Sequence, residues 1–249
     1  MVNEPAQVDA TRPWLAHLRP ALDGALAAWQ AGSPVALALS MAKSGAAGPA
    51  GPAGPDGAAG LPRFVPQSAL PEGEAYEAFI YRSAGVPTRC NLHDFFNGLV
   101  WIAQPALKHR LNALQAAEIN RAGVGQQRGP LRDALTLFDE NGALLAAPAV
   151  LRLALQARDW HALFITHRAR WAEARLMIVG HALLDKLATA PRKALTAHVL
   201  VGDALTMTPA GWAAKPFLPL PVLGVPGWWP ANDDPAFYDD ATVFRPPRR

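Results

Sequence analysis

Apolar residues near the start of the chain recur every three or four positions, which is the spacing of one face of an amphipathic helix. This pattern predicts a helix over about residues 13–30. Thr11 supplies a candidate capping hydroxyl, and Pro13 suits the first turn of a helix. The face that we expect to dock on the core consists of Trp14, Leu18, Leu22, Leu26 and Trp29.

The same reasoning predicts further helices in the middle of the chain. Asn91 is a typical helix cap, and the helix after it should run to about residue 103. The next helix should span about residues 105–120, with a buried stripe of leucines. A helical pattern then extends over about residues 148–187.

Patterns typical of strands are fewer. Residues 135–146 read as a β-hairpin, because two short apolar runs flank Asp139–Gly142, whose Asn-Gly pair suits a tight two-residue turn. Residues 195–201 predict another strand. Residues 76–81 fit either a short strand or one helical turn.

Two segments have an unusual composition. Glycine stands at every third position over residues 45–60, with prolines between, but the repeat is too short for a collagen triple helix, so we expect a flexible surface insertion. Residues 209–249 are rich in proline, which excludes long helices and central strands, and their aromatic residues argue against disorder. We predict an ordered, extended strap. Together the patterns predict one α+β domain over residues 1–249, mostly helical, with a small antiparallel hairpin or sheet and this C-terminal strap.

Composition places the chain among soluble proteins. Of its 249 residues 51% are hydrophobic and 17% are charged, yet no apolar run approaches the roughly 20 residues that cross a bilayer, so we expect no membrane association. The N-terminal residues do not resemble a secretory signal. The one cysteine, Cys90, has no partner for an internal disulfide. These features predict a cytoplasmic location.

The net charge of the chain gives little information about its partners. The formal net charge is +3, and part of the excess lies in the terminal Arg245, Arg248 and Arg249. No dense basic stripe accompanies them, so we do not expect a nucleic acid as a partner.

Common catalytic motifs are absent from the sequence. It contains no GxxxxGK[ST] loop, no HExxH, no paired CxxC and no GxSxG. What remains is a polar cluster within residues 88–140. His93 and Asn97 are four positions apart and would share a helix face, next to Asp94. The following helix carries Lys108, Asn112 and Gln115 on one face.

These residues suggest a site for acid–base chemistry. His93 could act as the acid or base, while Asp94, Asp133 or Asp139 could orient it or bind a metal. The full candidate set is His93, Asp94, Asn97, Asp133, Asp139 and His181. A purely structural interpretation is also open: acidic residues are common at helix starts and in turns, and His181 lies in an apolar stretch where core histidines occur.

Several long strings resemble a bacterial protein family known as domain of unknown function 3025. The resemblance lies in the segments 86–89, 93–101, 111–115, 132–142, 180–184, 220–228, 237–240 and 243–245. It covers most of the chain outside the glycine-proline insertion and the ends. It implies a bacterial protein with the fold of that family, and it implies no activity, cofactor or metal.

Two functions from different classes follow as hypotheses. The first is an enzyme that acts on a small molecule, most plausibly a hydrolase, with a polar pocket around His93, Asp94 and Asn97. The alternative is a non-catalytic interaction module that presents Trp228 and Trp229 of the strap to a partner. A weaker third hypothesis is an anion or nucleic-acid binder that uses the terminal arginines. The sequence specifies neither a cofactor nor an oligomeric state.

Overall fold

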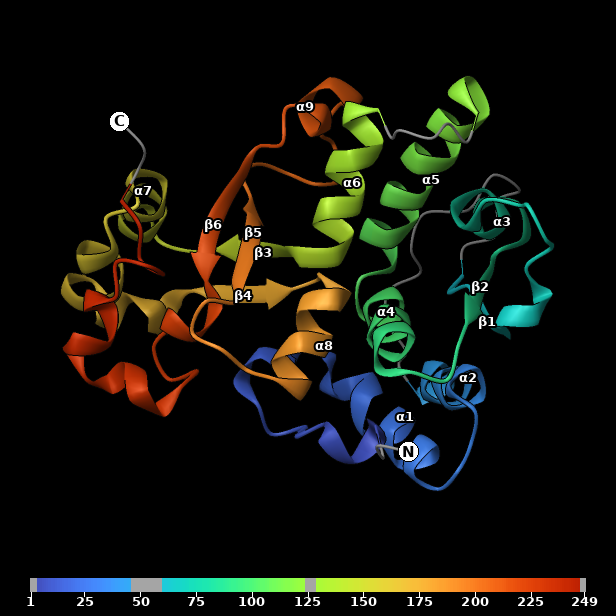
Figure 1. Cartoon of the computed structure of the whole chain (residues 1–249), viewed down its shortest axis with the longest axis horizontal. Coiled ribbons are helices and arrows are strands. Elements are labelled where there is room, and N and C mark those ends of the chain that lie inside the picture. Colours follow the sequence, from blue (N-terminus) through green and yellow to red (C-terminus); the bar gives the residue numbers. More distant parts are fainter. Residues whose placement is uncertain (1–3, 46–59, 124–128, 247–249) are drawn as a thin grey trace.

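A computed structural model describes residues 4–45, 60–123 and 129–246 of the chain, and it has an α+β fold (Figure 1). In Figure 1 the four-stranded sheet and the pair β1–β2 lie on opposite sides of a central group of helices formed by α4, α5, α6 and α8. The α-helices are α1 (Arg19–Gln30), α2 (Val35–Gly45), α3 (Tyr76–Ser83), α4 (Leu92–Ala103), α5 (Pro105–Ala122), α6 (Pro130–Asn141), α7 (Ala149–Ala157), α8 (His181–Thr189) and α9 (Pro209–Ala213).

The main sheet is mixed rather than antiparallel. Its strand order is β4-β3-β5-β6, in which β3 pairs parallel with β5, and the two outer pairs are antiparallel. A separate parallel pair joins β1 and β2. The strands are β1 (Arg63–Pro66), β2 (Gly85–Thr88), β3 (Gly142–Ala146), β4 (Arg175–Ile178), β5 (Thr196–Leu200) and β6 (Phe217–Pro221).

The predicted hairpin over residues 135–146 is wrong. Its first arm and its turn belong to α6, and only its second arm is a strand, β3. Ala134, Leu135 and Phe138 are buried on one face of α6 at helical spacing. Gly142, which the hairpin needed at a positive φ, has φ −74° and starts β3 directly. The helical period of the apolar face therefore outweighs the Asn-Gly turn signal.

The continuous helical pattern predicted over residues 148–187 is interrupted. Helix α7 ends at Ala157, and a π-helical turn (Ala162–Thr166) and a 3-10 helix (Arg168–Glu173) follow it. Strand β4 then pairs with β3 before α8 begins. The apolar residues of this region pack on several elements, so their spacing is not that of one helix.

Other sequence expectations agree with the structure. The predicted helix over 13–30 is a 3-10 helix (Pro13–Leu18) that continues as α1, although the Thr11 hydroxyl bonds Asp9 rather than capping it. Residues 76–81 belong to helix α3. Helices α4 and α5 have nearly the predicted bounds, and β5 lies within the predicted strand. Most of the insertion over 45–60 lies outside the described residues.

The described part of the C-terminal strap, residues 209–246, closes one side of the core. Strand β6 lies at a sheet edge, where its two prolines are tolerated. Beyond it the chain folds into short turns whose aromatic rings pack on Phe164. The ring of Tyr238 is stacked on Phe164 at 5.1 Å between centroids, and the ring of Phe244 meets it edge-on at 5.9 Å. The buried side chains of both sheets and the central helices form one cluster.

Among the described residues no helix is long and apolar enough to cross a membrane.

Gly180 sets the position of α8 against α6. A Cβ atom at Gly180 would lie 2.5 Å from Cα of Asn141 and 2.6 Å from its backbone N and C atoms, so backbone must move to admit it. We predict that Gly180→Ala lowers the free energy of unfolding by about 1–3 kcal/mol, measured by urea denaturation. Gly24→Ala is the control, because an added Cβ there meets no described atom within 4 Å and should stabilise α1 slightly. Equal stability of both variants would contradict this packing constraint.

His17 links the N-terminal 3-10 helix to the end of β4. Its Nε2 atom lies 2.9 Å from the carbonyl oxygen of Ile178, and burial lowers the pKa of His17 from 6.5 to about 4. Below pH 6.5 the unfolded chain therefore binds a proton at His17 that the folded chain does not bind. The free energy of unfolding consequently decreases as the pH is lowered.

We predict that the wild-type protein loses about 2 kcal/mol more stability than His17→Gln between pH 7.5 and pH 5, because glutamine can donate to the same carbonyl but does not titrate. Urea denaturation at the two pH values measures the difference. An identical pH dependence of the two proteins would show that His17 is not protonated on unfolding.

Candidate functional site

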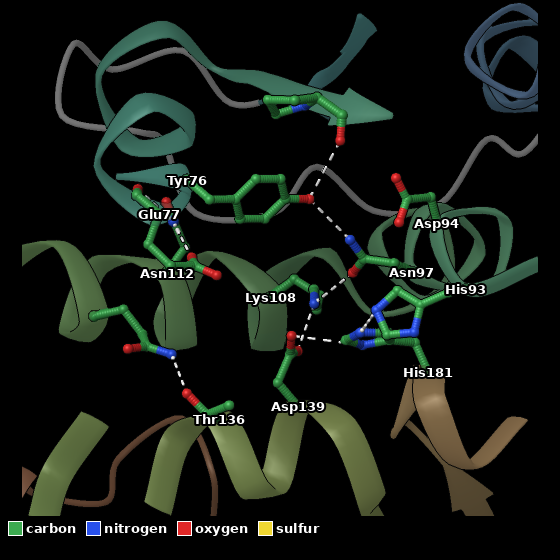
Figure 2. Close-up of polar contacts among 12 residues, drawn as sticks. Tyr76, Glu77, His93, Asp94, Asn97, Lys108, Asn112, Thr136, Asp139 and His181 are labelled. Carbon is green, nitrogen blue, oxygen red and sulfur yellow. Dashed lines mark hydrogen bonds and ion pairs between the residues drawn. The ribbon is translucent and has the colours of Figure 1, made fainter. Parts of the chain in front are cut away.

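The polar cluster predicted from the sequence lies where α3, α4, α5, α6 and α8 meet. Figure 2 shows His93 and Asn97 of α4, Lys108 of α5, Asp139 of α6 and His181 of α8 pointing toward one another. Elements far apart in the sequence therefore bring five ionisable or amide side chains to one place.

Asp94 shapes the start of α4. The side chain of Asn91 accepts a hydrogen bond from the backbone N–H of Asp94 at 2.8 Å, which caps the helix as predicted. Both carboxylate oxygens of Asp94 are bonded by Arg89, at 3.0 Å from Nε and 2.9 Å from a terminal nitrogen, and the backbone N–H of Arg89 adds a third bond. Asp94 thus lines the site, but its carboxylate is engaged in holding the turn from β2 into α4.

Asn97 connects α3 to α5. Its amide nitrogen donates to the hydroxyl oxygen of Tyr76 at 3.0 Å, and its carbonyl oxygen accepts from Lys108 at 2.8 Å. Burial and the nearby acidic groups raise the pKa of Tyr76 well above 10, so this phenol stays protonated. The arrangement aims the Lys108 ammonium at the centre of the cluster.

Lys108 and Asp139 form an ion pair inside the protein. The Nζ–Oδ1 distance is 2.5 Å, and only 5% of the Lys108 side chain is exposed. Burial alone would raise the pKa of Asp139, but the charge and the hydrogen bond of Lys108, together with the nearby His181 and His93, outweigh burial, and the pKa lies below its usual value. Asp139 is therefore an anion at neutral pH.

The two histidines meet beside this ion pair. Nε2 of His181 lies 3.0 Å from Nε2 of His93, with the rings nearly perpendicular. Nδ1 of His181 faces Asp139 at 3.6 Å, and it is buried with no hydrogen-bond partner among the described residues. Burial lowers the pKa of His181 to about 4, so the ring is neutral at neutral pH.

This geometry selects one tautomer of His181. The Asp139 carboxylate favours a proton on Nδ1, because an N–H group is attracted to the anion and a lone pair is repelled by it. Nε2 of His181 then carries the lone pair and can accept the Nε2–H of His93. The buried histidine thus directs a lone pair toward His93.

The histidines line a pocket of about 370 Å³ that opens to solvent. Its wall also contains Glu140 of α6, and one ligand atom each from His93, Glu140 and His181 lie within 4.8 Å of one another. Arg132 lines the same pocket, and its buried Nε has no hydrogen-bond partner in the described part of the chain. The remaining lining residues include Ala75, Tyr76, Glu77, Arg89, Asp94, Asn97, Gln115, Ile119, Thr136 and Asp139.

The structure brings together five of the six candidate residues from the sequence. His93, Asp94, Asn97, Asp139 and His181 all line this pocket. Asp133 does not: its carboxylate is largely exposed and pairs with Lys215 beyond α9. Asp133 lies six residues, or nearly two helical turns, before Asp139, so the two carboxylates lie on different stretches of α6.

Sequence reasoning left Tyr76, Glu77 and Glu140 out of the candidate set. Tyr76 and Glu77 begin α3, a segment whose secondary structure the pattern left open, and no spacing connects them to the cluster. Glu77 is bonded by Asn112 at 2.6 Å, and burial raises its pKa. Glu140 lies in the segment that had been interpreted as a turn. The sequence feature that did point to this site was the polar face of α5. Its Lys108, Asn112 and Gln115 are all buried in the structure.

The aromatic residues of the strap are engaged within the molecule. Trp228 and Trp229 are partly buried, and both pack against the core cluster. Trp228 lies 6.4 Å from Trp14 between ring centroids, and the Arg12 guanidinium lies 6.0 Å from the ring of Trp229. Arg245 is exposed, while Arg248 and Arg249 lie outside the described residues.

Comparison with known proteins identifies a family and no activity. A family model described as a protein of unknown function, DUF3025, matches residues 62–248. No curated protein and no solved structure matches the chain. The matched range includes every residue that lines the pocket.

The burial of the Lys108–Asp139 pair leads to a prediction about the free energy of unfolding. Lys108→Met leaves a buried carboxylate without its cation, and Asp139→Asn leaves a buried ammonium without its anion, so each should cost about 3 kcal/mol. The double variant should cost at least about 1 kcal/mol less than the sum, measured by urea denaturation. Lys215→Met, which breaks the exposed pair with Asp133, is the control and should cost less than about 1 kcal/mol. Additive costs at Lys108 and Asp139 would contradict the coupling.

Proposed function

Since the chain belongs to the DUF3025 family, to which no activity is assigned, we propose from its geometry that it is an enzyme that hydrolyses a small polar molecule in the His93–His181 pocket. The observation that carries this proposal is the meeting of the two imidazoles at 3.0 Å at a solvent-open pocket, with an anion behind His181. Because the lone pair of the neutral His181 is aimed at His93, the pair can take up a proton from water that is bound beside His93.

The histidine pair can carry out the proton transfers that hydrolysis requires. A water molecule bound beside the histidine pair gives up a proton toward the pair while its oxygen bonds to the electrophilic atom of the substrate. The bond to the leaving group breaks with its electron pair, and the proton is returned to that group. The Lys108–Asp139 pair keeps the negative charge behind His181 in place throughout.

The pocket also indicates the kind of substrate. Arg132 lines the pocket, and its buried Nε has no hydrogen-bond partner among the described residues, whereas the other arginine of the wall, Arg89, is bonded to Asp94. Guanidinium groups bind carboxylates and phosphates in a bidentate geometry. We therefore expect a substrate with an anionic group that lies against Arg132 while its scissile bond faces the histidines.

The alternative, an interaction module built on the aromatic strap, has less support. Trp228 and Trp229 pack on the protein's own core, so the rings do not form an apolar patch that awaits a partner. We retain the expectation of a reducing, cytoplasmic setting for the enzyme, because Cys90 is an exposed free thiol.

A panel of chromogenic esters, phosphomonoesters, phosphodiesters and amides, each with and without added Zn²⁺ or Mn²⁺, tests the proposal. We predict that the full-length protein hydrolyses at least one anionic member. His93→Ala and His181→Ala should each lower kcat/KM by about 100-fold or more, since one acid–base group contributes that much.

Asp133→Asn is the matched control, because it removes a carboxylate from α6 outside the pocket and should leave kcat/KM within about twofold. Thermal melts confirm that each variant is folded. The proposal fails if the folded wild-type protein turns over no member of the panel, or if the histidine variants and Asp133→Asn keep the same activity.

A further inference from the structure

We propose that His93, His181 and Glu140 bind a divalent transition-metal ion in the pocket. The inference rests on the proposed function in one respect, since it names the group that activates water there. Binding of the ion can nevertheless be measured without any substrate.

The distances favour such a site. Zinc bonds of about 2.0–2.2 Å in tetrahedral geometry place the ligand atoms about 3.3 Å apart. The two Nε2 atoms are 3.0 Å apart, and one ligand atom each from His93, His181 and Glu140 lie within 4.8 Å of one another. An ion bound between the imidazoles takes the place of the proton that Nε2 of His93 otherwise shares with His181. Glu140 is only partly buried, which leaves its side chain room to turn toward the histidines.

The surroundings of His181 supply an independent argument. Metal-bound histidines usually direct their other ring nitrogen at a carboxylate, which fixes the tautomer and makes the ligand nitrogen more basic. Nδ1 of His181 faces Asp139 in this way, and it has no other partner among the described residues. Asp139 is in turn held by Lys108. Consecutive carboxylates therefore have different tasks, with Asp139 orienting a ligand and Glu140 acting as one.

The charges agree with this assignment. Asp139 is paired with Lys108, so Glu140 is the carboxylate that remains to bring negative charge to the two imidazoles. Two imidazoles and one carboxylate suit Zn²⁺ and its first-row neighbours better than Mg²⁺ or Ca²⁺, which prefer oxygen ligands. Three protein ligands leave a coordination position for water on the pocket side, as in zinc hydrolases.

Isothermal titration of the chelator-treated, tag-free, full-length protein with ZnCl₂ tests the site directly. We expect one Zn²⁺ per chain with a Kd in the micromolar range or below. Glu140→Gln should weaken binding by about tenfold or more, and His93→Ala and His181→Ala should abolish it. Co²⁺ should give visible absorption bands in the wild-type protein that are lost in His93→Ala.

Two variants control for adventitious binding. His161→Ala removes an exposed histidine and Asp133→Asn an exposed carboxylate of α6, and both should leave the affinity and the Co²⁺ spectrum unchanged. If a histidine variant fails to fold, the affinity of Glu140→Gln for Zn²⁺ decides whether the site exists. This variant should fold, because Glu140 is partly exposed and glutamine has nearly the same shape as glutamate.

The outcomes separate the two proposals. The metal site is overturned if the wild-type protein binds no stoichiometric Zn²⁺, or if binding survives in Glu140→Gln and His93→Ala. Hydrolysis by the histidines alone is tested separately, by the substrate panel. Binding that follows the predicted variants supports the metal site even if every substrate in the panel fails.

Discussion

The buried ion pair between Lys108 and Asp139 is the interaction on which the rest of the site depends. Placing an ammonium and a carboxylate among packed helices is costly unless each charge is compensated and hydrogen-bonded. Here Asn97 accepts a hydrogen bond from the Lys108 ammonium and donates one to the hydroxyl oxygen of Tyr76. The network therefore joins α3, α4, α5 and α6. Its consequence is a fixed anion directly behind His181.

The fold is arranged so that this anion meets the histidines. The close approach of Gly180 to Asn141 seats the first residue of α8 beside the last turn of α6. The Asn91 cap and the Arg89–Asp94 pair set the first turn of α4, which carries His93. Strand β4 leads into Gly180 and is tied to the N-terminal segment by His17. The chemistry of the pocket thus also rests on contacts at its edge and beyond it.

The sequence predicted much of this arrangement where local rules are strong. The capped helix after Asn91 and the leucine stripe of α5 follow from spacing, and the polar face of α5 was recognisable as a site because Lys108 lies beside that stripe. The hairpin predicted over residues 135–146 was wrong because an Asn-Gly pair, which favours a tight hairpin turn, also occurs here at the end of a helix. The helix-to-strand junction there is decided by the burial of Leu135 and Phe138.

The parts that could not be predicted depend on tertiary contacts. Asp139 and Asp133 look equivalent in the sequence, yet one is buried against Lys108 and the other is exposed against Lys215. Tyr76 joins the network through a helix whose pattern is ambiguous. The parallel pairing of β3 with β5 joins residues that are 56 positions apart, such as Gly142 and His198, and no local signal encodes such a partner.

The central claim is that His181 is neutral, with its proton on Nδ1 and a lone pair on Nε2 directed at His93. Long-range ¹H–¹⁵N correlation spectra of the histidine side chains at pH 7, recorded on the metal-free protein and assigned with His181→Gln, measure this directly. The account predicts that His181 gives the pattern of a neutral ring protonated at Nδ1. A His181 ring protonated at Nε2, or one that is doubly protonated at pH 7, would contradict it.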